Sequence, residues 1–246
     1  GAIVQLANGD GRRALGLLEL AVSEAAAAGL AEVTVEGVAR LAQRKVLLYD
    51  KAGEEHFNLI SALHKSLRES DPDAALYWLG RMLAAGEDPN YLARRLVRFA
   101  SEDIGLADPQ ALPQALAGWQ SYERLGSPEG EVALAQVTIY LALAPKSVAV
   151  YRAYGEVKRT IEERPAEPVP LALRNAPTKL MKGLGYGRDY VYAPDTEEGV
   201  AGLDCLPDAL AGTSFYRPTE KGFEARLAER LAEFARRRQA ARGGAR

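Results

Sequence analysis

Residues 70–89 read SDPDAALYWLGRMLAAGEDP, with an aspartate–proline pair near each end. In Asp71-Pro72 and in Asp88-Pro89, the carboxylate can accept a hydrogen bond from the free N–H groups of a helix start, and a proline at the first helical position loses no hydrogen bond. The apolar residues between the two pairs recur at helical spacing: Leu76, Leu79, Met82 and Leu83. The stretch therefore predicts a helix over 72–86 and a second helix start directly after it.

The same type of helix start recurs further along the chain, in Asp108-Pro109 and Ser127-Pro128. Upstream, residues 54–68 carry an apolar stripe at helical spacing: Phe57, Ile60, Leu63 and Leu67. Such closely spaced helices leave short connections, which favour antiparallel packing of neighbours. The predicted fold class is all-α, an antiparallel helical bundle or array.

One segment of this array, 132–144, is apolar almost all round. Such a helix lies either in the centre of a domain or in a contact between subunits, and the sequence leaves both interpretations open.

The character of the chain changes after Arg164, where three prolines predict an extended connector. A short helix near 171–182 is expected to follow. Residues 183–218 are rich in glycine, proline, aspartate and tyrosine, and we expect a long irregular segment that wraps over the helices. A last helix is expected from about Thr219.

The composition is that of an ordinary globular chain: of 246 residues, 48% are hydrophobic and 26% are charged. The net charge of -2 gives no overall attraction to nucleic acid or to a membrane. The single cysteine, Cys205, excludes an intrachain disulfide and fits a reducing compartment. We therefore expect a cytoplasmic protein with no membrane partner.

Motifs for catalysis are missing from this chain. It contains no GxxxxGK[ST] phosphate loop and no HExxH, CxxC or GxSxG motif. His56 and His64 lie more than two turns apart on one predicted helix, which does not suit a shared metal ion. We expect no catalytic residue, no metal and no cofactor within this chain.

Near the start of the chain, Gly9-Asp10-Gly11 interrupts a helical pattern, and Arg12 and Arg13 open a helix that is predicted to reach Ala28. Its apolar face would carry Leu15, Leu18 and Val22. Arginines beside a helix start can contact phosphate, although they are more often solvated surface residues. The first helices are too small for a complete domain, so we expect a fragment of a helical bundle.

An alternative activity is nucleic-acid binding by residues 174–192, where basic residues are interleaved with tyrosines. The candidates are Arg174, Lys179, Lys182, Tyr186, Arg188, Tyr190 and Tyr192. The cations would contact phosphates and the rings would stack on bases. The arginine-rich C-terminus from Arg236 would add to this surface, although arginines near the end of a helix also suit its dipole.

Segments over most of the chain carry a resemblance to a known family. The first, GDGRRAL (9–15), looks like the sensor-2 segment in the lid of AAA+ ATPases of the clamp-loader clade. The others are DKAGEEHFNLISALHKS (50–66), SDPDAALYWL (70–79), SEDIGLADP (101–109), YLALAPKS (140–147), LGYG (184–187) and FYRPT (215–219). Together they resemble replication-associated recombination protein A, a family that includes the Werner-helicase-interacting ATPase.

The resemblance implies a DNA-dependent ATPase that acts at stalled or damaged replication forks, with ATP and Mg²⁺ as cofactors of the full-length protein. It implies a partial lid over 1–48 and a C-terminal helical domain over 49–246 that forms a homotetramer. It also makes Arg12 the sensor-2 arginine that contacts nucleotide in the intact protein. The ATPase core is absent from this chain, so we expect this piece to assemble the protein without turning over ATP.

The same resemblance implies partners and a location. Besides a second copy of the chain, the expected partners are single-stranded DNA-binding protein and DNA at replication forks. The expected location is the bacterial cytoplasm, in association with the nucleoid.

Overall fold

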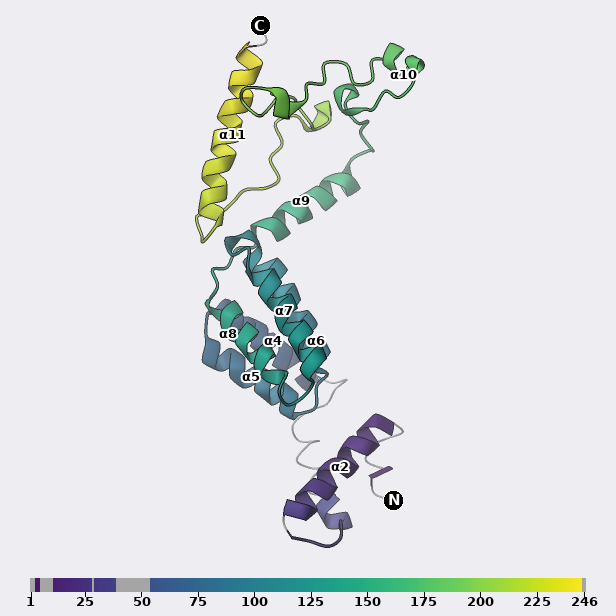
Figure 1. Cartoon of the computed structure of the whole chain (residues 1–246), viewed down its shortest axis with the longest axis vertical. Coiled ribbons are helices and arrows are strands. Elements are labelled where there is room, and N and C mark those ends of the chain that lie inside the picture. Colours follow the sequence, from purple (N-terminus) through teal and green to yellow (C-terminus); the bar gives the residue numbers. More distant parts are fainter. Residues whose placement is uncertain (1–2, 5–10, 28, 39–53, 245–246) are drawn as a thin grey trace. The chain divides into compact units, whose positions relative to one another are not determined.

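The computed structural model describes residues 3–4, 11–27, 29–38 and 54–244. Every regular element among these residues is a helix, as Figure 1 shows, so the all-α prediction is confirmed. The chain forms two compact units, Gly1–Leu92 and Ala93–Arg246. The predicted boundary between 48 and 49 falls outside the described residues.

The first unit begins with α2 (Gly11–Ala27). Gly29 follows in the left-handed region, with φ 66°, as the predicted helix stop requires. Thr34 then starts a short helical turn over 35–38, because its hydroxyl accepts a hydrogen bond from the Gly37 N–H at 3.1 Å. Ala21 and Val38 are buried against each other, with Ile3 packed beside them.

The apolar face predicted for α2 is not buried. Leu15, Leu18 and Val22 are all exposed, whereas Ala21 is the residue of this helix that packs against Val38. The leucine spacing predicts the helix correctly. Burial of a helix face also requires a second element packed against it, and among the described residues such packing occurs only beside Ala21.

Helices α4 (Glu54–Arg68) and α5 (Pro72–Ala84) pack against each other. They form where the sequence predicts them, because Asp71 accepts from the Ala74 N–H at 2.9 Å and Pro72 is the first residue of α5. The short connection, 69–71, keeps the two helices next to each other. The fully buried side chains of the pair include Leu59, Leu63, Leu67, Leu79 and Met82.

One member of the predicted α4 stripe is misplaced: Phe57 is 66% exposed. Its ring lies edge-on to His56, 5.2 Å between centroids, and not in the core. Leu59 is buried instead, so the buried face of α4 is rotated from the predicted one.

Helix α6 (Pro89–Phe99) also starts as predicted, with the Asp88 carboxylate accepting from the Asn90 N–H at 3.0 Å. It continues into a π-helical turn, η1 (Ala100–Ile104), and a 3-10 turn, η2 (Gly105–Ala107). Gly105 has φ 54° between the two turns, a conformation that favours glycine.

The two remaining predicted helix starts are wrong in detail. Helix α7 (Ala111–Leu125) begins after Asp108-Pro109, and α8 (Glu131–Leu143) begins after Ser127-Pro128. Asp108 caps the turn before α7 by accepting from the Gln110 N–H at 3.0 Å, and its second oxygen accepts from the Tyr140 hydroxyl at 2.5 Å. This carboxylate therefore joins the start of α7 to α8.

The elements predicted after Arg164 occur in the predicted order, but their residue ranges differ from the predicted ones. Helix α9 (Ala149–Glu163) precedes the proline connector. The single helix expected near 171–182 is two short pieces, η3 (Leu171–Leu173) and α10 (Lys179–Gly183). Two 3-10 turns follow, η4 (Ala193–Asp195) and η5 (Asp208–Leu210).

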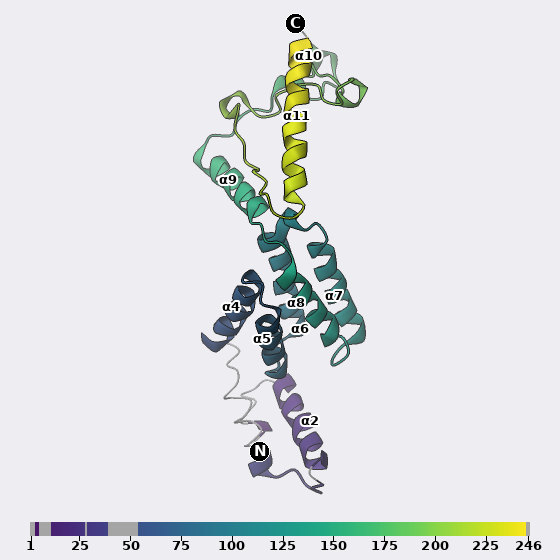
Figure 2. The ribbon, with the colours of Figure 1, turned by 90° about the vertical axis from the view of Figure 1, so that its left-hand side faces the viewer.

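The last helix, α11 (Glu224–Gly244), starts five residues after Thr219. Figure 2 shows the irregular segment beside the C-terminal half of this helix. Arg242 fixes it there by donating from Nε to the Gly202 carbonyl at 2.6 Å and by bonding Asp204. The predicted wrapping segment thus packs on α11.

The start of α11 is tied to the preceding helices by Glu224, which is fully buried. Its carboxylate accepts from the Ser147 hydroxyl at 2.7 Å, from the Thr219 N–H and hydroxyl at 2.8 Å each, and from the Tyr216 hydroxyl at 3.3 Å. Next to it, the Phe223 N–H donates to the Ala107 carbonyl at 2.7 Å. These bonds position α11 against η2 and the α8–α9 connection.

Candidate functional site

Helix α8 has two different sides. Leu134, Val137 and Leu141 are buried on one of them. On the other, Val132 and Leu143 are 70% and 64% exposed, and Ile139 lies between them. This spacing places the three exposed side chains on one face, which we call the α8 stripe. The interpretation as a core helix thus describes one side of α8, and the interpretation as a subunit contact stays a prediction for the exposed side.

Helix α9 also leaves an apolar face open. Tyr151, Tyr154 and Ile161 are all more than half exposed and follow the spacing of one helix face. The ammonium of Lys158 lies 5.2 Å from the Tyr154 ring centroid, on the same face. We call these four residues the α9 stripe.

The opposite side of α9 is covered by its own chain. Glu156 accepts from the Arg217 guanidinium at 3.2 Å, and Val150 lies beside Gly105. The α9 stripe is therefore the free side of an otherwise anchored helix.

Of the predicted basic and aromatic residues, the structure brings Arg174 and Tyr186 together. The Arg174 guanidinium lies 5.0 Å from the Tyr186 ring centroid, and its Nε donates to the Val169 carbonyl at 2.7 Å. These contacts hold the loop around Tyr186 and leave Arg174 half-buried. Their geometry is that of a structural cation–π pair.

The other three cations of this segment are exposed: Lys179 and Lys182 on α10, and Arg188 after it. None of them has an ion-pair partner among the described residues. Tyr190 and Tyr192 are each more than half exposed. The segment therefore presents exposed positive charge and accessible rings, and its role in nucleic-acid binding stays a prediction.

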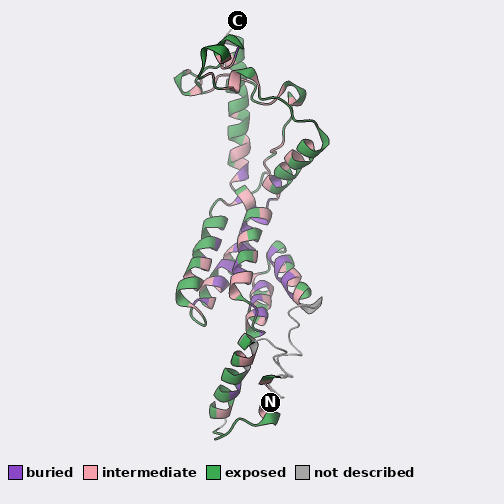
Figure 3. Cartoon of the chain, turned by 90° about the vertical axis from the view of Figure 1, so that its right-hand side faces the viewer, coloured by how far each residue is buried: buried purple, intermediate pink, exposed green. Residues whose placement is uncertain are grey.

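The arginine-rich C-terminus is partly engaged within the chain. Arg237 bonds Glu233 and stacks on Phe234, with 6.0 Å between guanidinium and ring, while Arg242 bonds Asp204. Arg236 and Arg238 remain exposed, as does most of α11 in Figure 3. Only part of the predicted positive charge is available to a ligand.

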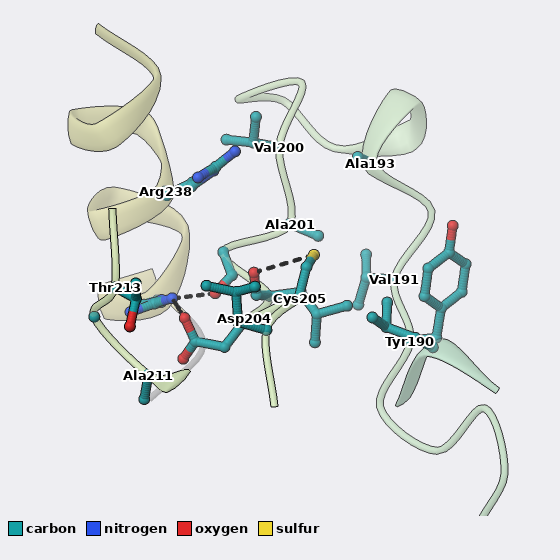
Figure 4. Close-up of a pocket in the computed structure, with 16 residues that line it drawn as sticks. Tyr190, Val191, Ala193, Val200, Ala201, Asp204, Cys205, Ala211, Thr213 and Arg238 are labelled. Atoms are coloured by element: carbon teal, nitrogen blue, oxygen red, sulfur yellow. Dashed lines mark hydrogen bonds and ion pairs between the residues drawn. The ribbon is translucent and has the colours of Figure 1, made fainter. Parts of the chain in front are cut away.

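A pocket of about 560 Å³ lies between the irregular segment and α11 (Figure 4). Its walls are mainly apolar, with Val191, Val200 and Leu203 among them, and Arg238 and Cys205 also line it. Sequence reasoning missed this pocket. The signal was Gly202, whose φ is 65° and where a Cβ would lie 3.0 Å from the Arg238 carbonyl oxygen, so that only glycine allows this approach to α11.

Two tyrosines and one lysine have shifted pKa values for structural reasons. Burial, with the hydrogen bond to Asp108, raises the pKa of Tyr140 to about 12, and burial beside Glu224 raises the pKa of Tyr216 to about 12. Burial lowers the pKa of Lys146, whose ammonium donates to the Ala144 carbonyl at 2.7 Å and also to the Ala142 carbonyl. Each of these groups donates a hydrogen bond to a carboxylate or to a backbone carbonyl where helices meet.

The remaining sequence candidates show no reactive cluster. Arg12 lies in α2, and its side chain is outside the described residues. His56 contacts the Glu87 carboxylate at 2.9 Å and belongs to the packing around α4. In the described part of the chain, no group of three or more histidine, cysteine, aspartate and glutamate side chains could hold a metal ion. No helix there is long and apolar enough to cross a membrane.

This chain matches two family models of C-terminal regions of AAA+ ATPases. Residues 69–235 match the family described as MgsA AAA+ ATPase C terminal, and residues 1–68 match the AAA C-terminal domain. The chain belongs to the MgsA AAA+ ATPase C-terminal family.

The relatives carry one recurring name. The chain is 50% identical over 231 residues to replication-associated recombination protein A of Coxiella burnetii, which covers 93% of this chain and 52% of that protein. It is 46% identical over 241 residues to the protein of the same name from Escherichia coli K12, covering 97% of this chain and 54% of that protein. It is 40% identical over 234 residues to ATPase WRNIP1 of Dictyostelium discoideum, covering 87% of this chain and 27% of that protein. The chain thus spans about half the length of the first two, and the resemblance seen in the sequence is confirmed.

Proposed function

We propose that this chain is the self-assembly region of a longer AAA+ ATPase and that it holds four copies together as a homotetramer. The α8 stripe carries the proposal, because Val132, Ile139 and Leu143 are open to solvent on a helix whose other side is core. Full burial of an aliphatic side chain of this size contributes about 1.5–3 kcal/mol. An apolar face of this kind beside a packed core is typical of a protein contact.

Light scattering on the chain at tens of micromolar tests this proposal. The expected mass is about four times 26.5 kDa. Val132→Asp combined with Ile139→Asp should lower the mass, because each carboxylate would have to be desolvated in the contact. Val169→Asp, at an exposed position outside both stripes, is the matched control and should leave the mass unchanged. A wild-type mass of one chain contradicts the proposal.

For the full-length protein, we propose a DNA-dependent ATPase that uses ATP and Mg²⁺ at replication forks, in the bacterial cytoplasm near the nucleoid. Residues 1–48 would form part of its lid and 49–246 its assembly domain, with single-stranded DNA-binding protein as a partner. The names of the relatives support the replication role. Arg12 would contact the terminal phosphates of the nucleotide, so Arg12→Ala should lower ATP turnover by the full-length protein and leave its mass unchanged. Unchanged turnover contradicts the role of Arg12.

A second candidate function is binding of single-stranded DNA by residues 174–192. The observation that favours it is local charge: the segment has four basic residues and one acidic residue in a chain of net charge -2, and three of the cations are exposed and unpaired within the described residues. Lys179→Glu with Lys182→Glu should weaken binding of labelled single-stranded DNA at low salt and reduce its salt dependence. Lys221→Glu, exposed before α11, is the control. Binding that is absent at low salt removes this candidate.

A further inference from the structure

The pocket between the irregular segment and α11 has the size and the lining of a small-molecule site. Its volume, about 560 Å³, lies within the range of about 300–1,000 Å³ that is usual for ligand pockets. Most of its wall is apolar and comes from side chains such as Val191, Val200, Leu203 and Leu206. A pocket of this composition takes a ligand with a largely apolar body.

Contacts within the chain hold the wall of this pocket against α11. Gly202 has φ 65°, and a Cβ there would lie 3.0 Å from the Arg238 carbonyl oxygen. Arg242 donates to the Gly202 carbonyl at 2.6 Å and bonds Asp204. The chain itself makes these contacts, so the pocket is pre-formed and ligand binding requires little ordering of the protein.

The charged side chains of the wall leave one positive charge without a counterion. Asp204, Arg238 and Arg242 line the pocket, and the first and the last of them form an ion pair. Arg238 is exposed and has no ion-pair partner in the part of the chain that the structure describes. Figure 4 shows its guanidinium directed from α11 towards Val200. A guanidinium in this position can bind a carboxylate through two parallel N–H bonds.

The other polar side chains of the wall are few. They are the Tyr190 hydroxyl, the Thr213 hydroxyl and the Cys205 thiol, and the thiol already contacts the Leu203 carbonyl at 3.8 Å. A peptide brings a donor and an acceptor with every residue, and burial of an amide without a hydrogen bond is unfavourable. The wall therefore favours a ligand whose only polar group is its carboxylate.

We propose that this pocket binds a free carboxylic acid with an apolar body, of the size of a medium-chain fatty acid. The carboxylate pairs with Arg238, and the hydrocarbon lies against Val191 and Val200. This site is separate from the α8 stripe, and it uses neither of the cations of α10.

Calorimetric titration of the whole chain with octanoate tests the affinity. Arg238→Gln should weaken binding about tenfold, because the charged hydrogen-bond donor of the carboxylate is lost. Arg230→Gln, exposed on the same helix and outside the pocket, is the matched control and should leave the affinity unchanged. Octanamide has the same apolar body without the charge, and it should bind the wild type about as weakly as octanoate binds Arg238→Gln.

Three results of this titration overturn the proposal. The first is no binding of octanoate to the wild type at millimolar concentration. The second is equal binding of octanoate and octanamide. The third is tighter binding of a short peptide that ends in leucine, which would assign the pocket to a peptide in place of a free acid.

Alkylation of Cys205 by iodoacetamide, followed by mass spectrometry, locates the bound acid. This residue is the single cysteine of the chain, it is exposed, and it lines the pocket. Octanoate at ten times its Kd should slow the alkylation about tenfold, because about nine-tenths of the pockets are then occupied. The same concentration should slow it much less in Arg238→Gln. Octanoate binding that does not protect Cys205, or a thiol that iodoacetamide does not reach in the ligand-free chain, overturns the assignment to this pocket.

Discussion

Glu224 shows how one carboxylate fixes the position of a whole helix. Burial alone would raise the pKa of Glu224, but hydrogen bonds from the Thr219 N–H, Ser147, the Thr219 hydroxyl and Tyr216 outweigh it and hold the pKa below 4.5. Two of the family-like segments, YLALAPKS and FYRPT, therefore meet at this residue. Ser147 in the first segment, and Tyr216 and Thr219 in the second, donate the hydrogen bonds that the buried Glu224 carboxylate accepts.

We expect Glu224→Ala to destabilise the chain by about 3 kcal/mol, because three side chains and one backbone N–H lose a charged acceptor in a buried place. The depressed pKa means that the native state favours the charged form, so this contribution is complete above pH 4.5 and is lost as the pH falls through the lower native pKa. Urea unfolding followed by circular dichroism measures both effects. Glu229→Ala, exposed on the same helix, is the control, and equal losses in the two variants contradict this role of Glu224.

At the scale of elements, the close contact between α7 and α8 depends on Gly118. A Cβ at this position would lie 2.3 Å from Cγ2 of Val137, and the backbone carbonyl of Ala133 is 3.3 Å away. Valine in a helix has essentially one χ1 rotamer, so it cannot turn aside. The two helices must separate if residue 118 gains a side chain.

Gly118→Ala should therefore destabilise the chain by about 1–3 kcal/mol, through overpacking. Gly80→Ala is the matched opposite case: Gly80 is also inside a helix, α5, but its Cβ would meet nothing within 4 Å. That substitution should stabilise the chain by about 0.5–1 kcal/mol, through helix propensity alone. Denaturation midpoints of the two variants separate the effects, and a change of the same sign in both contradicts the packing argument.

The helices could be predicted from sequence wherever the decisive interaction is local. Asp71 and Asp88 cap the helices they precede, so α5 and α6 begin where expected. Asp108 could not be predicted in the same way, because its second oxygen is bound by Tyr140, far along the chain, and the carboxylate serves a turn. The pocket beside α11 has the same cause: Gly202 is recognisable only once α11 is placed against it.

The candidate surfaces show the same division. The exposure of Lys179, Lys182 and Arg188 follows from a local, polar segment, whereas their contact with nucleic acid stays a prediction. The division of α8 into a buried side and an exposed side could not be predicted. The helix is apolar almost all round, so its sequence does not indicate which side faces the core. Packing against α7 decides which side is buried.

At the scale of the whole molecule, the chain carries apolar stripes on α8 and α9 and a positive segment after them, although its net charge is close to zero. A monomer would leave both stripes in water. Self-association would bury them and leave residues 174–192 available for a polyanion, so the two candidate functions do not compete for the same side chains.

A chain that assembles in this way must melt at a temperature that depends on its concentration, because dissociation precedes or accompanies unfolding. A tenfold increase in concentration should raise the midpoint by about 2–4 °C for a chain of this size. The Val132→Asp/Ile139→Asp variant should melt lower and at a midpoint that no longer depends on concentration, whereas Val169→Asp should behave like the wild type. Calorimetry over a hundredfold range of concentration measures this, and a wild-type midpoint that stays constant throughout would mean that the stripes are stable in water and that the α8 side chains are not a subunit contact.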